Sequence, residues 1–289
     1  MKWPAQGGPF IDLESSPACT SGRGQLGQCV HFAPLSHRFQ VLRLLQCAHH
    51  QHWKMRVVEW DELEKVFSAP RMGRYKDRCH GNERYAMAAY RHNLLLSEAL
   101  TPFICTFEVS LRNAIHGQLS RHYCRVDWWQ SWKGDPRFSR QLTDIAGVRR
   151  KLHRRKEPQT PDKVVAELTF GFWSTLFNSE YQAELWSPLR RAFPYCPKQL
   201  RKRAAVSAIV NKMRILRNRT FHHEPILWIR ENASNVHLEG LQLLHWIHGG
   251  LGPWFASINR VPVIWAQWRE LESALLAGVV PREERAGTG

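Results

Sequence analysis

From about residue 57 onward, apolar side chains recur at intervals of three and four residues, and this spacing restricts the chain to helices. The clearest series is Phe103, Phe107, Leu111, Ile115 and Leu119, in which each residue follows the last by about one helical turn. No segment alternates as a half-buried strand would, no period of about 20–50 residues repeats, and no glycine-rich phosphate-binding loop occurs. The sequence therefore predicts an all-α fold.

The same periodicity sets the expected helices. Thr101-Pro102 and Thr160-Pro161 indicate helix starts, because threonine can cap a helix and proline suits its first turn. Residues 71–82 indicate a basic loop, and Pro225 should end or kink the helix before it. We expect helices at 61–67, 83–100, 101–123, 138–155, 160–177, 181–192, 198–216, 236–247 and 263–277.

Composition divides the chain into three parts. Residues 1–54 are rich in Gly, Pro, Ser and Gln, so we expect 1–56 to be disordered or an untranslated extension, with Met55 as a plausible start. The intact mass of the native protein would test this. Residues 57–277 form the predicted helical domain, and 278–289 a flexible tail. Cys47, His49, His50 and His52 fit no usual zinc pattern, which favours a polar tail over a metal site.

Charge indicates a polyanionic partner. Lys and Arg number 41 against 25 Asp and Glu, which gives a formal net charge of +16. Such a field attracts phosphate polymers, and we prefer a nucleic acid to the alternative of an anionic membrane because no basic amphipathic segment has a lipid-like face. No apolar stretch approaches the ~18–20 residues of a membrane span. Seven cysteines without a CxxC pair, and no secretory signal, indicate a reduced, cytoplasmic protein.

The run Arg217-Asn218-Arg219-Thr220-Phe221-His222-His223-Glu224 carries the sharpest chemical pattern. It places a permanent cation and a titratable base at the end of a basic helix. A neutral imidazole can take the 2′-hydroxyl proton of RNA, and a guanidinium can stabilise the charge that builds on phosphorus. This route needs no metal or other cofactor, and the sequence indicates none.

Helix geometry sets a condition on this pair. Residues five apart on a straight α-helix point about 140° apart. Arg217 and His222 could converge if the helix unwinds after Arg217, or if two copies of the motif meet across a two-fold axis. Taken alone, the Arg-x4-His spacing is weak, and a histidine that complements a helix C-terminus is an equally ordinary interpretation.

The wider text resembles the Abi-like (abortive infection) branch of the HEPN ribonuclease superfamily, whose motif is Arg-Asn-x-x-x-His. Blocks at 85–93, 107–115, 166–173 and 217–224 follow the family's order and cover roughly 57–250. The resemblance implies a HEPN-type helical bundle with additional helices, a homodimer and metal-independent endonuclease activity. It also implies that Arg217 binds the scissile phosphate, that His222 is the base, and that Asn218 orients the pair or holds the helix end. His223 could share either role.

Further residues are candidates within this interpretation. Glu108 and Arg112 form either a helix-surface ion pair or a border of the cleft that orients Arg217 or RNA, and Asn113 could serve likewise. The aromatic residues of 128–132 could stack on bases, although packing is the safer expectation. Two basic runs are either solvated faces or phosphate contacts, and we favour phosphate contacts for Arg149, Arg150, Arg154, Arg155, Lys198 and Lys202.

Three functions therefore stay open. The first is an RNA endonuclease that acts in phage defence or as a toxin, with a possible protein or RNA antitoxin. The second is a helical module that binds RNA, such as a small regulatory RNA, without cutting it. The third is a protein-binding adaptor of a defence complex. RNA cleavage in EDTA by the wild type and by Arg217→Ala and His222→Ala variants separates them.

Overall fold

The computed structural model describes residues 58–278, and this part of the chain consists of helices joined by turns and loops, with no strand. Predictions for residues 1–56, including the start at Met55 and the group around Cys47, lie outside the described residues, as does the tail after Gly278. The α-helices are α2 (Trp60–Phe67), α3 (Ala69–Arg78), α4 (Glu83–His122), α5 (Ser139–Arg154), α6 (Pro161–Glu167), α7 (Phe170–Thr175), α8 (Gln182–Leu189), α9 (Arg203–Phe221), α10 (Ala233–Ile247), α11 (Leu251–Ala256) and α12 (Val261–Leu276). The all-α prediction is confirmed.

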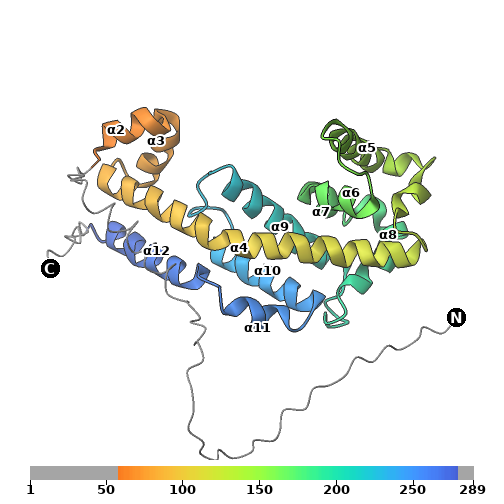
Figure 1. Ribbon diagram of the computed structural model, residues 1–289. Helices are drawn as coiled ribbons and strands as arrows, with labels where there is room; N and C mark the ends of the chain where they lie inside the picture. The colour runs from red at the N-terminus through yellow and green to blue at the C-terminus, as the bar shows by residue number, and fades with distance from the viewer. Residues whose placement is uncertain (1–57, 279–289) are drawn as a thin grey trace, which may run out of the picture. The chain divides into compact units, whose positions relative to one another are not determined.

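Helix α4 is the element on which the others pack. It contacts α3, α7, α8, α9, α10 and α12, and Figure 1 shows α5, α6, α7 and α9 along one side of it and α10, α11 and α12 along the other. Asn82 caps its N-terminus by accepting a hydrogen bond from the backbone of Tyr85 at 3.2 Å. Its buried residues include Phe103, Phe107 and Leu111, as the periodicity predicts.

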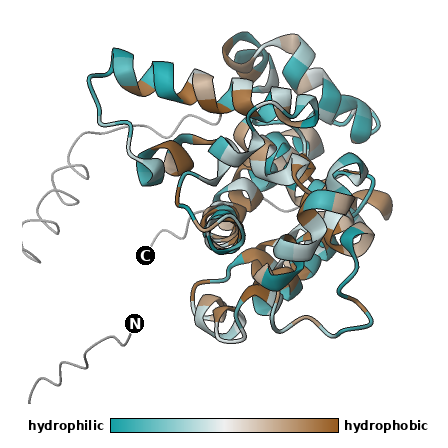
Figure 2. Ribbon diagram, turned by 90° about the vertical axis from the view of Figure 1, so that its right-hand side faces the viewer, coloured by the Kyte–Doolittle hydropathy of each residue, from teal (hydrophilic) through white to brown (hydrophobic). Residues whose placement is uncertain are grey.

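Helix α4 also has an 18-residue window apolar enough to cross a membrane by length and composition, with a hydropathy of 1.4. Because helices pack along this helix on both sides, we interpret it as the central helix of the fold. In Figure 2 hydrophilic and hydrophobic colours alternate along individual helices, as expected for helices with one buried face.

One aromatic cluster fixes the segment after α4. Trp128, Trp129 and Trp132 lie in a short 3-10 helix, Trp128–Trp132, and all three are buried. The Trp132 ring stacks on Phe138 with centroids 4.3 Å apart, and Phe138 stacks on Tyr181 at 5.3 Å. The expectation that these tryptophans pack in the core is confirmed, and their burial excludes the alternative that they stack on bases.

Two predictions before residue 125 are wrong. Residues 71–82 were expected as a loop, but Ala69–Arg78 forms α3, because Met72 and Tyr75 supply a buried face and Pro70 sits in the first turn. The helix break at Thr101-Pro102 is absent, and α4 runs through Pro102. Buried residues on both sides of the proline, Leu100 and Phe103, hold the helix straight through a position that intrinsic preference disfavours.

Two later boundaries also differ from the prediction. Residues 160–177 form α6 and α7 rather than one helix, because Thr169 caps a new start by accepting from the backbone of Phe172 at 3.3 Å. The helix expected from Lys198 begins at Arg203 instead. The Arg201 guanidinium donates to the Cys196 carbonyl at 2.6 Å and holds the preceding turn.

Candidate functional site

Helix α9 continues unbroken through the motif and ends at Phe221. His222 is its C-cap, and His223 follows in the left-handed region with φ of 55°. The backbone N–H of Glu224 donates to the Arg219 carbonyl at 2.9 Å, and that of His223 to the Thr220 carbonyl at 3.2 Å. These two bonds form a Schellman motif, which normally has glycine at the left-handed position. Of the two ways in which Arg217 and His222 could converge, unwinding of the helix after Arg217 is therefore excluded, and a meeting of two copies stays a prediction.

Side chains from two distant helices hold the turn that carries the histidines. Asn93 of α4 is only 1% exposed, and its Oδ1 accepts from the backbone of Ile226 at 2.7 Å while its Nδ2 donates to the Glu224 carbonyl at 3.3 Å. Arg71 of α3 donates to the His223 carbonyl at 2.6 Å. The backbone around His222 and His223 is thereby fixed, while both imidazoles remain exposed to solvent.

Arg217 is held from three sides. Its Nε donates to Oε1 of Glu108 on α4 at 2.7 Å, and its guanidinium carbon lies 5.0 Å from the centroid of the Phe221 ring. A terminal nitrogen, Nη1, is 3.5 Å from Oδ1 of Asn218. Because Glu108 occupies only Nε, the two terminal nitrogens are left without a carboxylate partner among the described residues. This is the edge of a guanidinium that binds phosphate in a bidentate way.

The other residues predicted to support the motif, Glu108, Arg112 and Asn113, have different partners. Within the described residues Glu108 and Arg112 form no ion pair, because Glu108 is bound to Arg217 instead. Arg112 donates from Nε to Oδ1 of Asn113 at 3.2 Å and from Nη1 to the Ala166 carbonyl at 3.4 Å. Glu108 therefore contacts Arg217 directly, whereas Arg112 and Asn113 do not, and a contact of these two residues with RNA stays a prediction.

Sequence reasoning missed the arginines of α3. Arg71, Arg74 and Arg78 follow each other at three- and four-residue spacing and share one face of α3, beside the face that buries Met72 and Tyr75. Two shallow depressions of 300 and 210 Å³ lie beside the motif turn and share three residues, Arg74, Glu224 and Pro225. Arg78 lines the first and Arg71 the second. The spacing in the sequence could have revealed this face, had residues 71–82 not been interpreted as a loop.

The two basic runs have different surroundings. Arg149, Arg150 and Arg154 line a surface groove on α5, whereas Arg155 is bound to Glu157 at 2.6 Å and to Glu167 at 2.7 Å. The carboxylates neutralise Arg155, so phosphate contact through this residue is disfavoured. Lys198 and Lys202 are exposed in the segment that precedes α9, and Lys202 provides its N-cap backbone.

Between residues 58 and 278 there is no group of three or more side chains that could hold a metal ion. Comparisons of the chain with protein-family models, with curated proteins and with solved structures give no match. The chemistry of the site must therefore be argued from its own residues.

Proposed function

We propose that this protein is a metal-independent RNA endonuclease of the Abi-like HEPN type, cytoplasmic and active as a homodimer. The observation that supports the proposal most strongly is how the nitrogens of the Arg217 guanidinium are paired. Glu108 binds its Nε and fixes its direction, while the terminal nitrogens that fit a phosphate have no carboxylate partner among the described residues. An exposed imidazole, His222, lies at the end of the same helix.

In the proposed reaction, neutral His222 takes the proton from a ribose 2′-hydroxyl. The 2′-oxygen then bonds to phosphorus, the bond from phosphorus to the 5′-oxygen breaks, and the leaving oxygen takes up a proton from water. The products are a 2′,3′-cyclic phosphate and a 5′-hydroxyl. Arg217 stabilises the extra negative charge on the pentavalent phosphate through its terminal nitrogens. No oxidant, metal or cofactor enters this balance.

The unbroken helix favours a site built from two chains. Five residues of continuous helix separate the directions of Arg217 and His222 by about 140°, and the guanidinium is tied to Glu108. A two-fold axis beside α9 would bring the Arg217 of one copy to the His222 of the other. The exposed apolar side chains of Val109, Ile215 and Phe221, which lie close in sequence to the ion pair, are suited to such a contact.

Cleavage of single-stranded RNA in the presence of EDTA tests the enzyme. We expect Arg217→Ala and His222→Ala each to lower the rate by about 10²–10³-fold, whereas His245→Ala, which removes another exposed histidine, leaves it unchanged. Retained cleavage in both site variants would contradict the mechanism. If the role is abortive infection or toxicity, expression should arrest growth and His222→Ala should relieve the arrest.

A second candidate function is RNA binding without cleavage, with a small regulatory RNA as the partner. The separation of Arg217 and His222 within one chain favours it, because a monomer then offers cations without a base placed at the same phosphate. Salt-dependent binding of uncut RNA by a monomeric protein would support this candidate over the nuclease.

A further inference from the structure

The basic residues at the end of α5 fall into two sets according to their partners. Lys151 donates to Glu167 at 2.8 Å, and Arg155 is bound to Glu157 and Glu167. The pairs with Glu167 connect α5 to α6. Lys163 also binds Glu157, at 2.6 Å, so both carboxylates already have basic partners. Four other basic side chains of α5 line a groove, the α5 groove: Arg149, Arg150, His153 and Arg154.

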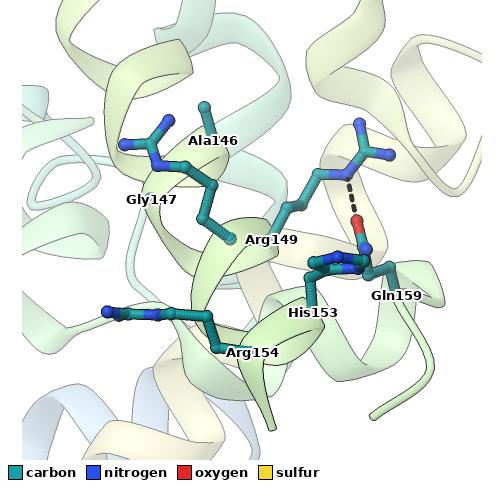
Figure 3. A pocket seen from close by; sticks show the side chains of 7 residues that line it. Ala146, Gly147, Arg149, His153, Arg154 and Gln159 are labelled. Carbon is teal, nitrogen blue, oxygen red and sulfur yellow. Dashed lines mark hydrogen bonds between the residues drawn. The ribbon is translucent and has the colours of Figure 1, made fainter. Parts of the chain in front are cut away.

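The α5 groove has a volume of 740 Å³ and is lined by Ala146, Gly147, Arg149, Arg150, His153, Arg154 and Gln159. Figure 3 shows Arg149 and His153 on the side of Gln159, and Arg154 extending to the other side. Only Arg149 has a partner there, since its Nε donates to Oε1 of Gln159 at 3.1 Å. Arg150 and Arg154 have no ion pair in the part of the chain that the structure describes, and no carboxylate lines the groove.

The helix arranges these basic side chains in two rows. Arg149 and His153 are one turn apart, and so are Arg150 and Arg154. The like charges of Arg150 and Arg154 at this spacing disfavour a helix, unless an anion lies between them. Ala146 stands between the rows, whereas Gly147 lies one turn before Arg150 at the edge of the second row, where an added Cβ would meet only the end of Arg150, at 3.9 Å. Because Ala146 and Gly147 have no side chain larger than a methyl group, an anion can approach the backbone of the helix.

The chemistry of the lining selects the kind of anion. The groove contains no Phe, Tyr or Trp ring for base stacking and no apolar side chain larger than alanine for an acyl chain. It offers guanidiniums, an imidazole and an amide, which bind phosphates and hydroxyls. Its size exceeds what one phosphate needs. These features fit a sugar–phosphate backbone that is bound without reading its sequence.

Contacts connect this groove with Arg217. Glu108, which holds Arg217, is one turn of α4 from Arg112, and Arg112 donates to the Ala166 carbonyl of α6. The next residue, Glu167, binds Lys151 and Arg155 of α5. Helices α5, α6 and α9 also lie along the same side of α4 in Figure 1. An extended polymer bound at Arg217 can therefore follow this side of the fold towards α5.

We propose that the α5 groove is a second binding site, for the phosphodiester backbone of RNA at a distance from the cleaved bond. The choice of RNA as the polymer rests on the proposed function. The groove holds the strand that leads away from Arg217 and His222, and its arginines contact phosphates without taking part in the reaction.

Binding of a labelled RNA oligonucleotide, measured by fluorescence anisotropy at several salt concentrations, tests this site. All variants carry His222→Ala, so that cleavage does not affect the measurement. Two lost phosphate contacts should lower the salt slope by about 1.4 and the affinity at 0.1 M salt by about tenfold or more in Arg150→Ala/Arg154→Ala. The control Arg190→Ala/Arg191→Ala removes the same charge from two exposed arginines on another element, Arg190–Ala192, and should lose less than about threefold. Equal losses in the two double variants would overturn the proposal.

A second pair of variants leaves every arginine in place. Gly147→Glu puts a carboxylate in the lining of the groove and should weaken RNA binding about as much as loss of the arginines does. Gly147→Ala adds only a methyl group, which would make an ordinary contact with the end of Arg150, and should keep the wild-type affinity. Wild-type affinity in Gly147→Glu would contradict the proposal, and thermal unfolding of each variant confirms that it is folded.

Cleavage then separates this proposal from the nuclease itself. If the parent protein cuts RNA, Arg150→Ala/Arg154→Ala should raise KM for a long RNA and leave the rate on a dinucleoside phosphate unchanged, because the short substrate cannot occupy both sites. An unchanged KM for the long RNA would contradict the second site. If the parent protein cuts no RNA, the proposed function fails, while the binding measurements still decide on the groove.

Discussion

At the scale of single residues, the contact between Glu108 and Arg217 is the one on which the proposed chemistry depends. The two residues are 109 positions apart in the chain, and their ion pair joins α4 to α9. The motif itself could be found in the sequence, because Arg217, Asn218 and His222 are close together. The sequence suggested Glu108 as a partner of Arg217 but did not determine it, because Glu108 could equally pair with Arg112 on its own helix.

We predict that Glu108→Ala lowers RNA cleavage by about 10–100-fold, because an arginine displaced by about 1 Å loses its alignment with the phosphate. Glu108→Gln keeps an oxygen that can accept from Nε of Arg217 and should recover part of the rate. Arg112→Ala is the control, since Arg112 contacts Asn113 and the Ala166 carbonyl instead, and it should have a smaller effect. If Glu108→Ala cuts as fast as the wild type, Glu108 does not position Arg217. Single-turnover rates at saturating RNA provide the measurement.

His237 makes the stability of the fold depend on pH. It is 1% exposed and packs edge-on against Phe103, and burial lowers its pKa to about 4 from the ordinary 6.5, against a smaller opposing effect of a hydrogen bond with Asn259. Above pH 6.5 the ring is neutral in both states. As the pH falls from 6.5 to 4, the unfolded chain takes up a proton that the folded chain does not, so this residue stabilises the unfolded state.

We therefore predict that His237 lowers the free energy of unfolding by up to about 3 kcal/mol between pH 7 and pH 4. Urea denaturation across this range measures the change. His237→Gln cannot titrate, and its curve should fall less steeply than that of the wild type. Parallel curves for the two proteins would show that the buried ring is not the cause.

At the scale of elements, tertiary packing determined the helix boundaries that local sequence preferences predicted wrongly. The positions of α5, α8 and α10 followed from periodicity, because each has an ordinary amphipathic face. The loop expected at 71–82 and the break at Pro102 were wrong for one reason. Gly73, Gly81 and Pro102 are local signals, whereas the burial of Met72, Tyr75 and Phe103 depends on contacts with other helices that a single sequence does not display.

Pro102 supplies a prediction about α4. A proline inside a helix lacks the N–H that would donate to the carbonyl four residues earlier, here that of Glu98. The side chain is exposed, so Pro102→Ala restores this donor without leaving a cavity. We expect a gain of about 1–2 kcal/mol in the free energy of unfolding, after the greater freedom of the unfolded chain is taken into account. A thermal midpoint at or below that of the wild type would show that α4 is adapted to the proline.

At the scale of the whole molecule, the position of the histidine turn links the fold to the proposed dimer. Asn93 and Arg71 fix the backbone around His222, and Glu108 fixes Arg217, so neither group can swing freely toward the other within one chain. Rigid side chains that diverge by about 140° serve one phosphate only if a second copy supplies the missing partner. The sequence indicated a site shared between two copies as one alternative. Because α9 is continuous, the proposed function requires this shared site.

The most direct test is to mix two inactive proteins. A dimer of Arg217→Ala with His222→Ala contains one site with both native groups if each site is shared between copies, and none if each site belongs to one copy. After random re-pairing of equal amounts, the two-fold arrangement predicts recovery of about one quarter of the wild-type cleavage rate. A mixture no more active than the two variants measured separately would contradict a site in which Arg217 and His222 come from different chains.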